Sequence, residues 1–560
     1  MRHTSLAQSR FRRAAAAIPA VAALGALVLP SPAGAGVPLQ FPVLPGHLLV
    51  ATSVFGFDPN IVAGVTQLPN GCTPGNCATA TASGEYPYVF NNDSVDGSFG
   101  VTTKLFLDQL TPSGIPLGSI EVPNSLEPGV GPNNNQMVTS FSSKSELALN
   151  LSPDGKYVSF MGYDAPVYTS DVSNDNTPGE NVSGNADPGL NYRVVATLGT
   201  NGKFNFTLTN AFTGDNGRAA VYNDKDHVLY FAGNASGAKK AQPGVLLGAG
   251  AQITTPSTLP EVLQAPGAPT PVGTFNITEL GDAADKAGKD DNFRGIGIYN
   301  NVLYYTKGSG SNGVNTLYYV NTSSTPCTNG VGLPQPGATL PTTPVTTSAV
   351  TGTALTPNNM CILSGLPTNL AANNPTMFPF GFWFANPTTL YIADEGSGDN
   401  TYSTTQTAYT NALPSAQPNA GLEKWVFNSA TQTWDLAYTL QSGLNLGQPY
   451  RVPGYPTGIN AATGLPWAPA TDGLRNMTGR VNHDGSVTIW ATSSTVSGGG
   501  DQGADPNKVV SITDKLSATT LPSWESFQTV RPAVSGVRYG GVSFTPGTCT
   551  SSASLPCVPP

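Results

Sequence analysis

The residues best suited to chemistry in this chain are arginines near the start of short β-type segments. Charged residues make up only 11% of the 560 positions, so each arginine is conspicuous. A guanidinium group offers a planar fork of donors that matches the oxygens of a carboxylate or sulfate group. Brought together, the segment heads would form a donor-rich cup for an anionic or polyhydroxylated ligand. The heads are Glu146, Arg218, Arg294, Phe380, Arg475 and Arg538.

Acidic residues offer a second kind of site. Asp290, Asp291 and Asn292 stand just before one of these segments, and carboxylate and amide oxygens are the ligands that calcium prefers. No spaced calcium-loop signature is complete, so a solvated turn is the favoured interpretation and calcium the alternative. Asp394 and Glu395 follow another β-type segment and add carboxylates to the candidate set.

Few other side chains are placed for acid/base work. Tyr163 and Tyr539 are candidate proton shuttles for a lyase, although aromatic packing is the commoner role. Beyond the N-terminal segment the histidines are His47, His227 and His483, which we interpret as structural. The sequence lacks nucleophile-elbow, zinc-protease, haem-attachment and phosphate-loop motifs. Any catalysis therefore needs scattered residues: arginine and tyrosine lyase chemistry, a carboxylate pair or a bound metal.

The N-terminal segment has the features of an export signal. Arginines precede an apolar run from Ala14 to Leu29, and small residues follow it, so we interpret residues 1–35 as a signal peptide. The Arg12 and Arg13 pair leaves Sec and twin-arginine export both open. No later apolar run is long enough to span a bilayer. The formal net charge of −9, without a later basic run, argues against nucleic-acid binding.

Six cysteines follow the signal segment, which is an even number for a secreted or periplasmic chain. Their spacing lacks the close Cys/His pattern of a metal cluster, so disulfides are the preferred interpretation. Proximity along the chain predicts the pairs Cys72 with Cys77, Cys327 with Cys361, and Cys549 with Cys557.

A repeated unit of two strands and a tight turn organises the chain. One copy is FRGIGIYNNVLYYTKGSG at residues 293–310. Further copies are SELALNLSPDGKYVSFMGY from Ser145, GRAAVYNDKDHVLYFAGN from Gly217, PFGFWFANPTTLYIADEGSG from Pro379 and MTGRVNHDGSVTIWATSS from Met477.

Alternating β-branched and aromatic segments after most copies predict third and fourth strands, as in propeller blades. The fold class we expect is all-β: a six-bladed β-propeller of four-stranded antiparallel blades over residues 36–548, followed by a disulfide-looped tail at 549–560. Seven blades are the alternative if a unit hides in 323–378 or 441–473. The segment Arg538–Phe544 should pair with His47–Ser53, closing the ring with both ends of the chain in one blade.

The repeats resemble known propeller families. LSPDGKYVSF looks like the TolB-type repeat, and TLYIADEGSG followed by GLEKW resembles the NHL and gluconolactonase-like pattern. This resemblance implies a blade rather than an activity, because that fold hosts lactonases, lyases, quinoprotein dehydrogenases and binding modules. The metal-ligand set of the gluconolactonase-like enzymes does not match here position by position.

In such a propeller the heads of the first strands converge at one mouth of the central channel. The first hypothesis is an enzyme, a lactonase-like hydrolase or a polysaccharide lyase, that acts there on a polar or anionic extracellular molecule. The second is a non-catalytic propeller that binds a protein or glycan at the cell envelope. The structural alternative is that the arginines only bridge neighbouring blades. Oligomeric state and any cofactor other than calcium stay open.

Overall fold

The computed structural model describes residues 42–55, 61–62, 64–68, 78–79, 100–130, 136–141, 147–178, 189–235, 249–257, 271–274, 291–309, 313–323, 327–343, 360–371, 375–461, 463–499 and 502–549. All of them belong to one compact unit, residues 41–560. This described part consists of strands joined by loops and short 3₁₀ turns, without an α-helix. It accordingly offers no helix that could serve as a membrane span.

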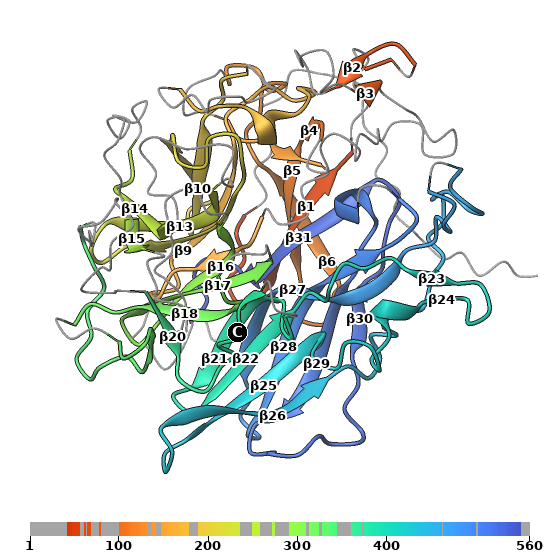
Figure 1. The fold of residues 1–560 in the computed structure, drawn as a ribbon. Helices are drawn as coiled ribbons and strands as arrows, with labels where there is room; N and C mark the ends of the chain where they lie inside the picture. The colour runs from red at the N-terminus through yellow and green to blue at the C-terminus, as the bar shows by residue number, and fades with distance from the viewer. Residues whose placement is uncertain are drawn as a thin grey trace, which may run out of the picture. The chain divides into compact units, whose positions relative to one another are not determined.

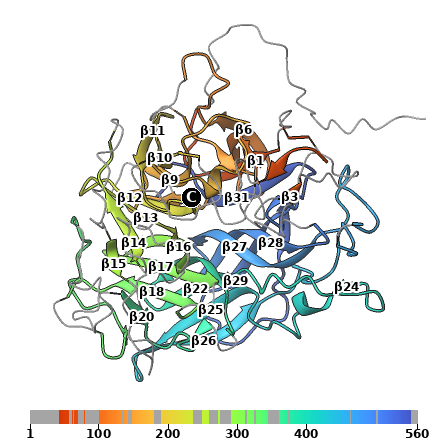
Figure 2. The same cartoon turned by 45° about the horizontal axis from the view of Figure 1, so that its top comes forward.

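Six four-stranded antiparallel units form the blades of a propeller (Figures 1 and 2). A short pairing of β13 with β16 joins the units of blades 3 and 4 into one continuous sheet. Blade 1 contains β31 (Val537–Phe544), β1 (Leu48–Val54), β5 (Leu105–Leu110) and β6 (Pro116–Glu121), and blade 2 contains β8 (Asn150–Leu151), β9 (Tyr157–Tyr163), β10 (Arg193–Gly199) and β11 (Phe204–Thr209). Blade 3 contains β12 (Gly217–Asn223), β13 (Val228–Ala235), β14 (Ala249–Thr254) and β15 (Pro271–Thr274), and blade 4 contains β16 (Asp291–Tyr299), β17 (Val302–Ser309), β18 (Thr316–Val320) and β20 (Met360–Leu363). Blade 5 contains β21 (Pro379–Asn386), β22 (Thr389–Asp394), β25 (Gly421–Asn428) and β26 (Thr433–Leu440), and blade 6 contains β27 (Ala470–Val481), β28 (Ser486–Val496), β29 (Val509–Lys515) and β30 (Gln528–Arg531).

The innermost strands of the blades contact one another in a closed cycle. The order of contacts is β31, β8, β12, β16, β21, β27 and back to β31. This cycle confirms the six-bladed prediction. The described residues of the connections 323–378 and 441–473 contain no further four-stranded sheet, so the seven-bladed alternative is wrong.

Both ends of the described chain meet in blade 1, as the sequence predicts. In Figure 1 the blue C-terminal strand β31 runs beside the red N-terminal strand β1. Their antiparallel register aligns Leu48 with Phe544 and Ser53 with Arg538, and β1 pairs with β5 on its other edge. The Thr545 hydroxyl extends the closure by donating a 2.7 Å hydrogen bond to the Leu44 carbonyl oxygen. The pairing of β1 with β31 therefore closes the ring of blades.

The hairpin of blade 4 requires particular residue types at its turn and at its contact with blade 5. Asn300 and Asn301 both have positive φ, 48° and 59°, which a two-residue hairpin of the type I′ class requires. A Cβ atom on Gly295 would collide with the carbonyl oxygen of Phe380, and one on Gly308 with that of Pro379. Glycine thus lets blades 4 and 5 approach closely beside the channel.

Some elements differ from the sequence expectation. The first strand of blade 2 is only Asn150–Leu151, because Leu147 takes a φ of 69° that interrupts an extended strand. The outer strands β14 and β15 of blade 3 and β20 of blade 4 were not foreseen. Three minor two-stranded sheets also occur in the described residues: β2 (Gln67–Leu68) with β3 (Ala78–Thr79), β4 (Thr102–Thr103) with β7 (Thr139–Ser140), and β23 (Tyr402–Ser403) with β24 (Ala408–Tyr409).

One predicted disulfide is confirmed. Cys327 and Cys361 are bonded and tie the long connection of blade 4 to β20, where Cys361 is fully buried. Another short strand in this connection, β19 (Val331–Gly332), pairs in parallel with β20. Cys549 is also disulfide-bonded. Cys557, Cys72 and Cys77 lie outside the described residues, so those two pairings stay predictions.

Candidate functional site

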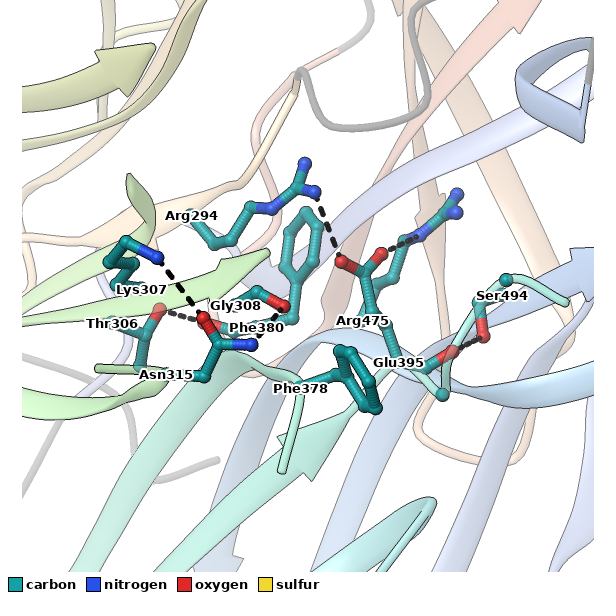
Figure 3. Close-up of polar contacts among 12 residues, drawn as sticks. Arg294, Thr306, Lys307, Gly308, Asn315, Phe378, Phe380, Glu395, Arg475 and Ser494 are labelled. Atoms are coloured by element: carbon teal, nitrogen blue, oxygen red, sulfur yellow. Dashed lines mark hydrogen bonds and ion pairs between the residues drawn. The ribbon is translucent and has the colours of Figure 1, made fainter. Parts of the chain in front are cut away.

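A buried charged cluster joins blades 4, 5 and 6 and includes three of the residues predicted for the channel mouth, Arg294, Phe380 and Arg475 (Figure 3). Glu395, directly after β22 of blade 5, accepts from two guanidinium groups. Its Oε1 lies 3.2 Å from Nη2 of Arg294 in β16, and its Oε2 accepts a 3.1 Å hydrogen bond from Nε of Arg475 in β27. All three side chains are at most 8% exposed. Two arginines from neighbouring blades therefore share one carboxylate.

Phe380 supports these arginines from β21 of blade 5. The guanidinium carbon of Arg294 lies 5.5 Å from the ring centroid, and that of Arg475 lies 5.9 Å from it. The ring is fully buried and sits between the two cations in Figure 3. Its negative face partly offsets their mutual repulsion, so Phe380 fixes the spacing of the guanidinium groups.

Backbone contacts hold Glu395 in position. Its N–H donates to the Phe378 carbonyl oxygen at 2.9 Å, and its own carbonyl oxygen accepts from the Ser494 hydroxyl at 2.6 Å. A 3.1 Å hydrogen bond from Lys307 Nζ to Asn315 Oδ1 places another buried cation on the Arg294 side of the cluster (Figure 3). The carboxylate is thus fixed by strands of blades 5 and 6 before any ligand arrives.

Further buried carboxyl groups surround this cluster. Asp394 accepts from the N–H groups of Phe378 and Gly396, at 2.6 and 2.8 Å. Asp472 accepts from the Gly398 N–H at 2.8 Å and from the Gln417 amide. Both carboxyl groups therefore anchor the loop that carries Glu395.

Burial shifts the protonation of these carboxyl groups toward neutral pH. Desolvation raises the pKa of Asp394 to about 7, and the charges of Glu395 and Asp472 add to the effect. Desolvation also raises the pKa of Asp472 to about 6, while its hydrogen bonds and Arg475 oppose the rise. The pKa of buried Asp505, whose Oδ1 accepts from the Tyr455 hydroxyl at 2.9 Å, rises to about 7 for the same reason. As the pH falls through this range, the carboxyl groups lose negative charge, while the arginines beside them keep their positive charge.

The other predicted arginines lie on adjacent strands of the same ring. Arg218 is in β12, next to β16, and Arg538 is in β31, next to β27. Both are buried, at 4% and 2% exposure. The ring order therefore puts all four predicted arginines on consecutive inner strands, with Phe380 between Arg294 and Arg475. Glu146 lies outside the described residues.

The two predicted tyrosines make structural contacts. The Tyr163 hydroxyl donates to Asn216 Oδ1 at 3.0 Å, and its ring lies 5.1 Å from the guanidinium carbon of Arg193. The Tyr539 hydroxyl donates to the Pro532 carbonyl oxygen at 3.3 Å, and its ring packs in an apolar cluster between blades. These contacts favour packing, and the proton-shuttle role stays a prediction without support from them.

The calcium site stays a prediction. Asp290 and the side chains of Asp291 and Asn292 lie outside what the structure describes; the backbones of Asp291 and Asn292 pair with Ala235 and Asn234. Among the described residues, no group of three or more His, Cys, Asp or Glu side chains is arranged to hold a metal ion.

Sequence reasoning named Glu395 but not its role, and it missed Asp472. Asp472 stands three residues before Arg475 in β27, so its place in an inner strand was a usable signal. The pairing of Glu395 with Arg294 and Arg475 had no local signal, because it depends on how three blades meet.

No family model matches the sequence, and a search of curated proteins gives no significant match. Among solved structures, a periplasmic gluconolactonase from Pseudomonas aeruginosa aligns at 7% identity with a TM-score of 0.33, covering 80% of this chain and 98% of that one. The NanB sialidase from Streptococcus pneumoniae aligns at 7% identity with a TM-score of 0.32, covering 72% of this chain and 62% of that one. An ulvan lyase aligns at 11% identity with a TM-score of 0.28, covering 88% and 97%. The six-blade assignment rests on the sheet topology above, not on these values.

Proposed function

We propose that this chain is an exported propeller whose channel mouth binds a polar or anionic extracellular ligand, with Arg475 as the principal donor. The observation that carries the proposal is that most N–H donors of the Arg475 guanidinium group are left for a ligand. Only its Nε donates to Glu395, and its two terminal nitrogens point away from the carboxylate in Figure 3. Among the described residues no acceptor takes these terminal N–H groups. A ligand carboxylate or a pair of hydroxyl groups matches such a fork.

The charge of the cluster supports an anionic ligand. Arg294 and Arg475 both pair with the single carboxylate of Glu395, so this triad contains two cations and one anion. Asp394 and Asp472 have pKa values of about 7 and about 6, so their negative charge diminishes below neutral pH. Affinity for an anion should therefore rise as the pH falls from 7 to 5.

The same pKa values allow acid/base chemistry of the lactonase-like or lyase kind, because a carboxyl group that titrates near neutral pH can both give and take a proton. Both carboxyl groups are, however, hydrogen-bonded to the loop at residues 396–398. This contact favours a role in shaping a binding site over a role in proton transfer. A non-catalytic propeller that recognises a glycan or an envelope protein through this mouth is the second candidate.

The test compares ligand affinity between matched arginine variants. Uronate oligosaccharides, neutral oligosaccharides and sugar lactones are titrated by calorimetry against the wild type, Arg475→Gln and Arg480→Gln. Arg480 lies in the same strand but is half-buried against Trp490, with a centroid distance of 5.4 Å. We expect Arg475→Gln to weaken binding at least about tenfold and Arg480→Gln to leave it unchanged. Equal affinity of all three proteins would overturn the proposal, and turnover of a bound ligand would favour the enzyme.

A further inference from the structure

Blade 6 carries a pocket that is separate from the channel mouth. Its volume is about 400 Å³, which lies in the range of about 300–1,000 Å³ usual for small-molecule sites. Its lining includes Ser511, Thr513, Lys515, Trp524, Glu525 and Gln528. Ser486, at the start of β28, also lines it, whereas Ser494 further along that strand contacts Glu395. Eight residues of strand at about 3.3 Å each separate the two places by roughly 26 Å.

Trp524 is the exposed aromatic wall of this pocket. Its side chain is 76% exposed. The other five tryptophans all lie in the described residues, and each is buried or half-buried. An indole kept in water at the edge of a pocket offers a flat apolar face beside polar groups. The C–H groups on one face of a pyranose ring are apolar and flat enough to stack on it.

Glu525 supplies a buried polar group to the same pocket. Its side chain is 7% exposed, and its Oε1 accepts a 2.9 Å hydrogen bond from the Lys515 N–H. Its Oε2 is buried and receives no hydrogen bond in the structure. Burial raises the pKa of Glu525 to about 7, and side-chain hydrogen bonding with Asp514 and the charge of that carboxylate add to the rise. Below neutral pH this carboxyl group is therefore largely uncharged.

The remaining lining is suited to hydroxyl groups rather than to a charged ligand. Ser511 and Thr513 contribute hydroxyls, Gln528 contributes an amide, and Lys515 is the single cation among the lining residues. Hydroxyl and amide groups both donate and accept, as the hydroxyls of a sugar do. A strongly anionic or cationic ligand would meet little opposite charge here.

The floor of the pocket is rigid. Lys424 Nζ donates to the Lys515 carbonyl oxygen at 2.8 Å and forms an ion pair with Asp514, also at 2.8 Å, inside the contact between blades 5 and 6. The end of β29 is therefore fixed from its inner side, while the Glu525 carboxyl accepts from its backbone. A preformed site loses less conformational entropy on binding.

We infer that this pocket is a binding site for a neutral pyranose unit of a glycan, stacked on Trp524 and hydrogen-bonded by Glu525 and the hydroxyls of β29. The site is independent of the channel mouth. It would hold a glycan on the outer part of blade 6 whether or not the mouth binds or cleaves the same molecule.

The test uses the exposed indole as its own reporter. Neutral gluco-, manno-, galacto- and xylo-oligosaccharides are titrated against the protein while iodide quenching of tryptophan fluorescence is measured. We expect at least one series to protect the indole of the wild type. Calorimetry, which does not depend on this indole, should show at least about tenfold weaker binding of the same series to Trp524→Ala. Leu521→Ala is the matched control, because Leu521 is 54% exposed in the same loop but is absent from the pocket lining. Glu525→Ala should weaken binding with the protein still folded by circular dichroism.

Arg475→Gln separates this inference from the proposed function, since it should leave the protection of Trp524 unchanged. Failure of every neutral oligosaccharide to protect Trp524 would overturn the inference. So would equal calorimetric affinity of Leu521→Ala and Trp524→Ala for the oligosaccharides, or protection by charged saccharides alone.

Discussion

Two buried ion clusters in neighbouring parts of this propeller differ in how completely their hydrogen bonds are used. Lys424 and Asp514 join blades 5 and 6 at 2.8 Å with both side chains fully buried. Lys424 Nζ also donates to the Tyr438 hydroxyl and to the Lys515 carbonyl oxygen, so its three donors are all used. The Asp514 carboxylate accepts from the hydroxyls of Tyr391 and Tyr438 as well.

In the other cluster, that of Arg294, Glu395 and Arg475, the hydrogen bonds of Arg475 to the described residues are incomplete. Arg475 donates from Nε alone, although a guanidinium group carries five N–H donors. A buried ion pair with every donor used is a contact between blades. A buried cation with donors to spare is a candidate binding site. The two clusters are almost equally buried. The number of N–H donors that have partners is what distinguishes a structural charge from a candidate functional one.

The largest expected effect is on stability at the Lys424 and Asp514 pair. Asp514→Ala leaves a buried ammonium group without its carboxylate, so unfolding free energy should fall by about 3–5 kcal/mol. Replacing both partners, Lys424→Met with Asp514→Leu, should recover much of this loss because no uncompensated charge remains. Chemical denaturation measures both. A loss below about 1 kcal/mol in the single variant would show that this ion pair does not stabilise the contact between blades 5 and 6.

A smaller effect is expected from the protonation of the carboxyl groups at the mouth. The folded-state pKa of Asp472 is about 6, above the ordinary value of 3.8, so protonation favours the folded state. Each pKa unit is worth about 1.4 kcal/mol, so this group can contribute up to about 3 kcal/mol. That stability is complete below pH 4 and is lost as the pH rises through 6.

Thermal melts at pH 5, 6, 7 and 8 check this expectation. The wild type should melt at a higher temperature at pH 5 than at pH 8, and Asp472→Asn should reduce the slope. Asp435→Asn, a change at an exposed carboxylate, should leave the slope as it is. A slope that is equal in all three proteins would remove Asp472 from the pH dependence.

The smallest stability effect is expected for Arg475. Arg475→Gln removes one charge-assisted hydrogen bond, but Glu395 keeps Arg294, so the cost should be only about 2 kcal/mol. Denaturation of Arg475→Gln beside Asp514→Ala measures the difference directly. If Arg475→Gln lowered the unfolding free energy as much as Asp514→Ala, the cluster of Arg294, Glu395 and Arg475 would also be a structural contact between blades, and the two clusters would not differ.

Much of the fold could be predicted because its signals are local. The turn at Asn300 and Asn301 and the alternating strands beside it mark a blade without reference to the rest of the chain. The closure of β1 on β31 follows from finding one half-repeat at each end. Strands β14, β15 and β20 were not predicted from the sequence, because long connections separate them from the hairpins of their blades.

The site was less predictable because its contacts join distant blades. The heads Arg294, Phe380 and Arg475 could be named from their place in the repeat. Their common partner Glu395 lies 80 residues from Arg475 in sequence, and only ring closure brings the two together. In the same way, Lys424 and Asp514 are 90 residues apart and have no local signature.

The most direct test of the central claim is to locate a bound oxyanion in a crystal of this protein. Selenate scatters anomalously and has the geometry of sulfate, so its position is read without ambiguity. We predict an anomalous peak within hydrogen-bond distance of the terminal nitrogens of Arg475, absent in Arg475→Gln crystals. A side chain of this protein occupying those nitrogens, or selenate bound elsewhere with none at the mouth, would contradict the proposal.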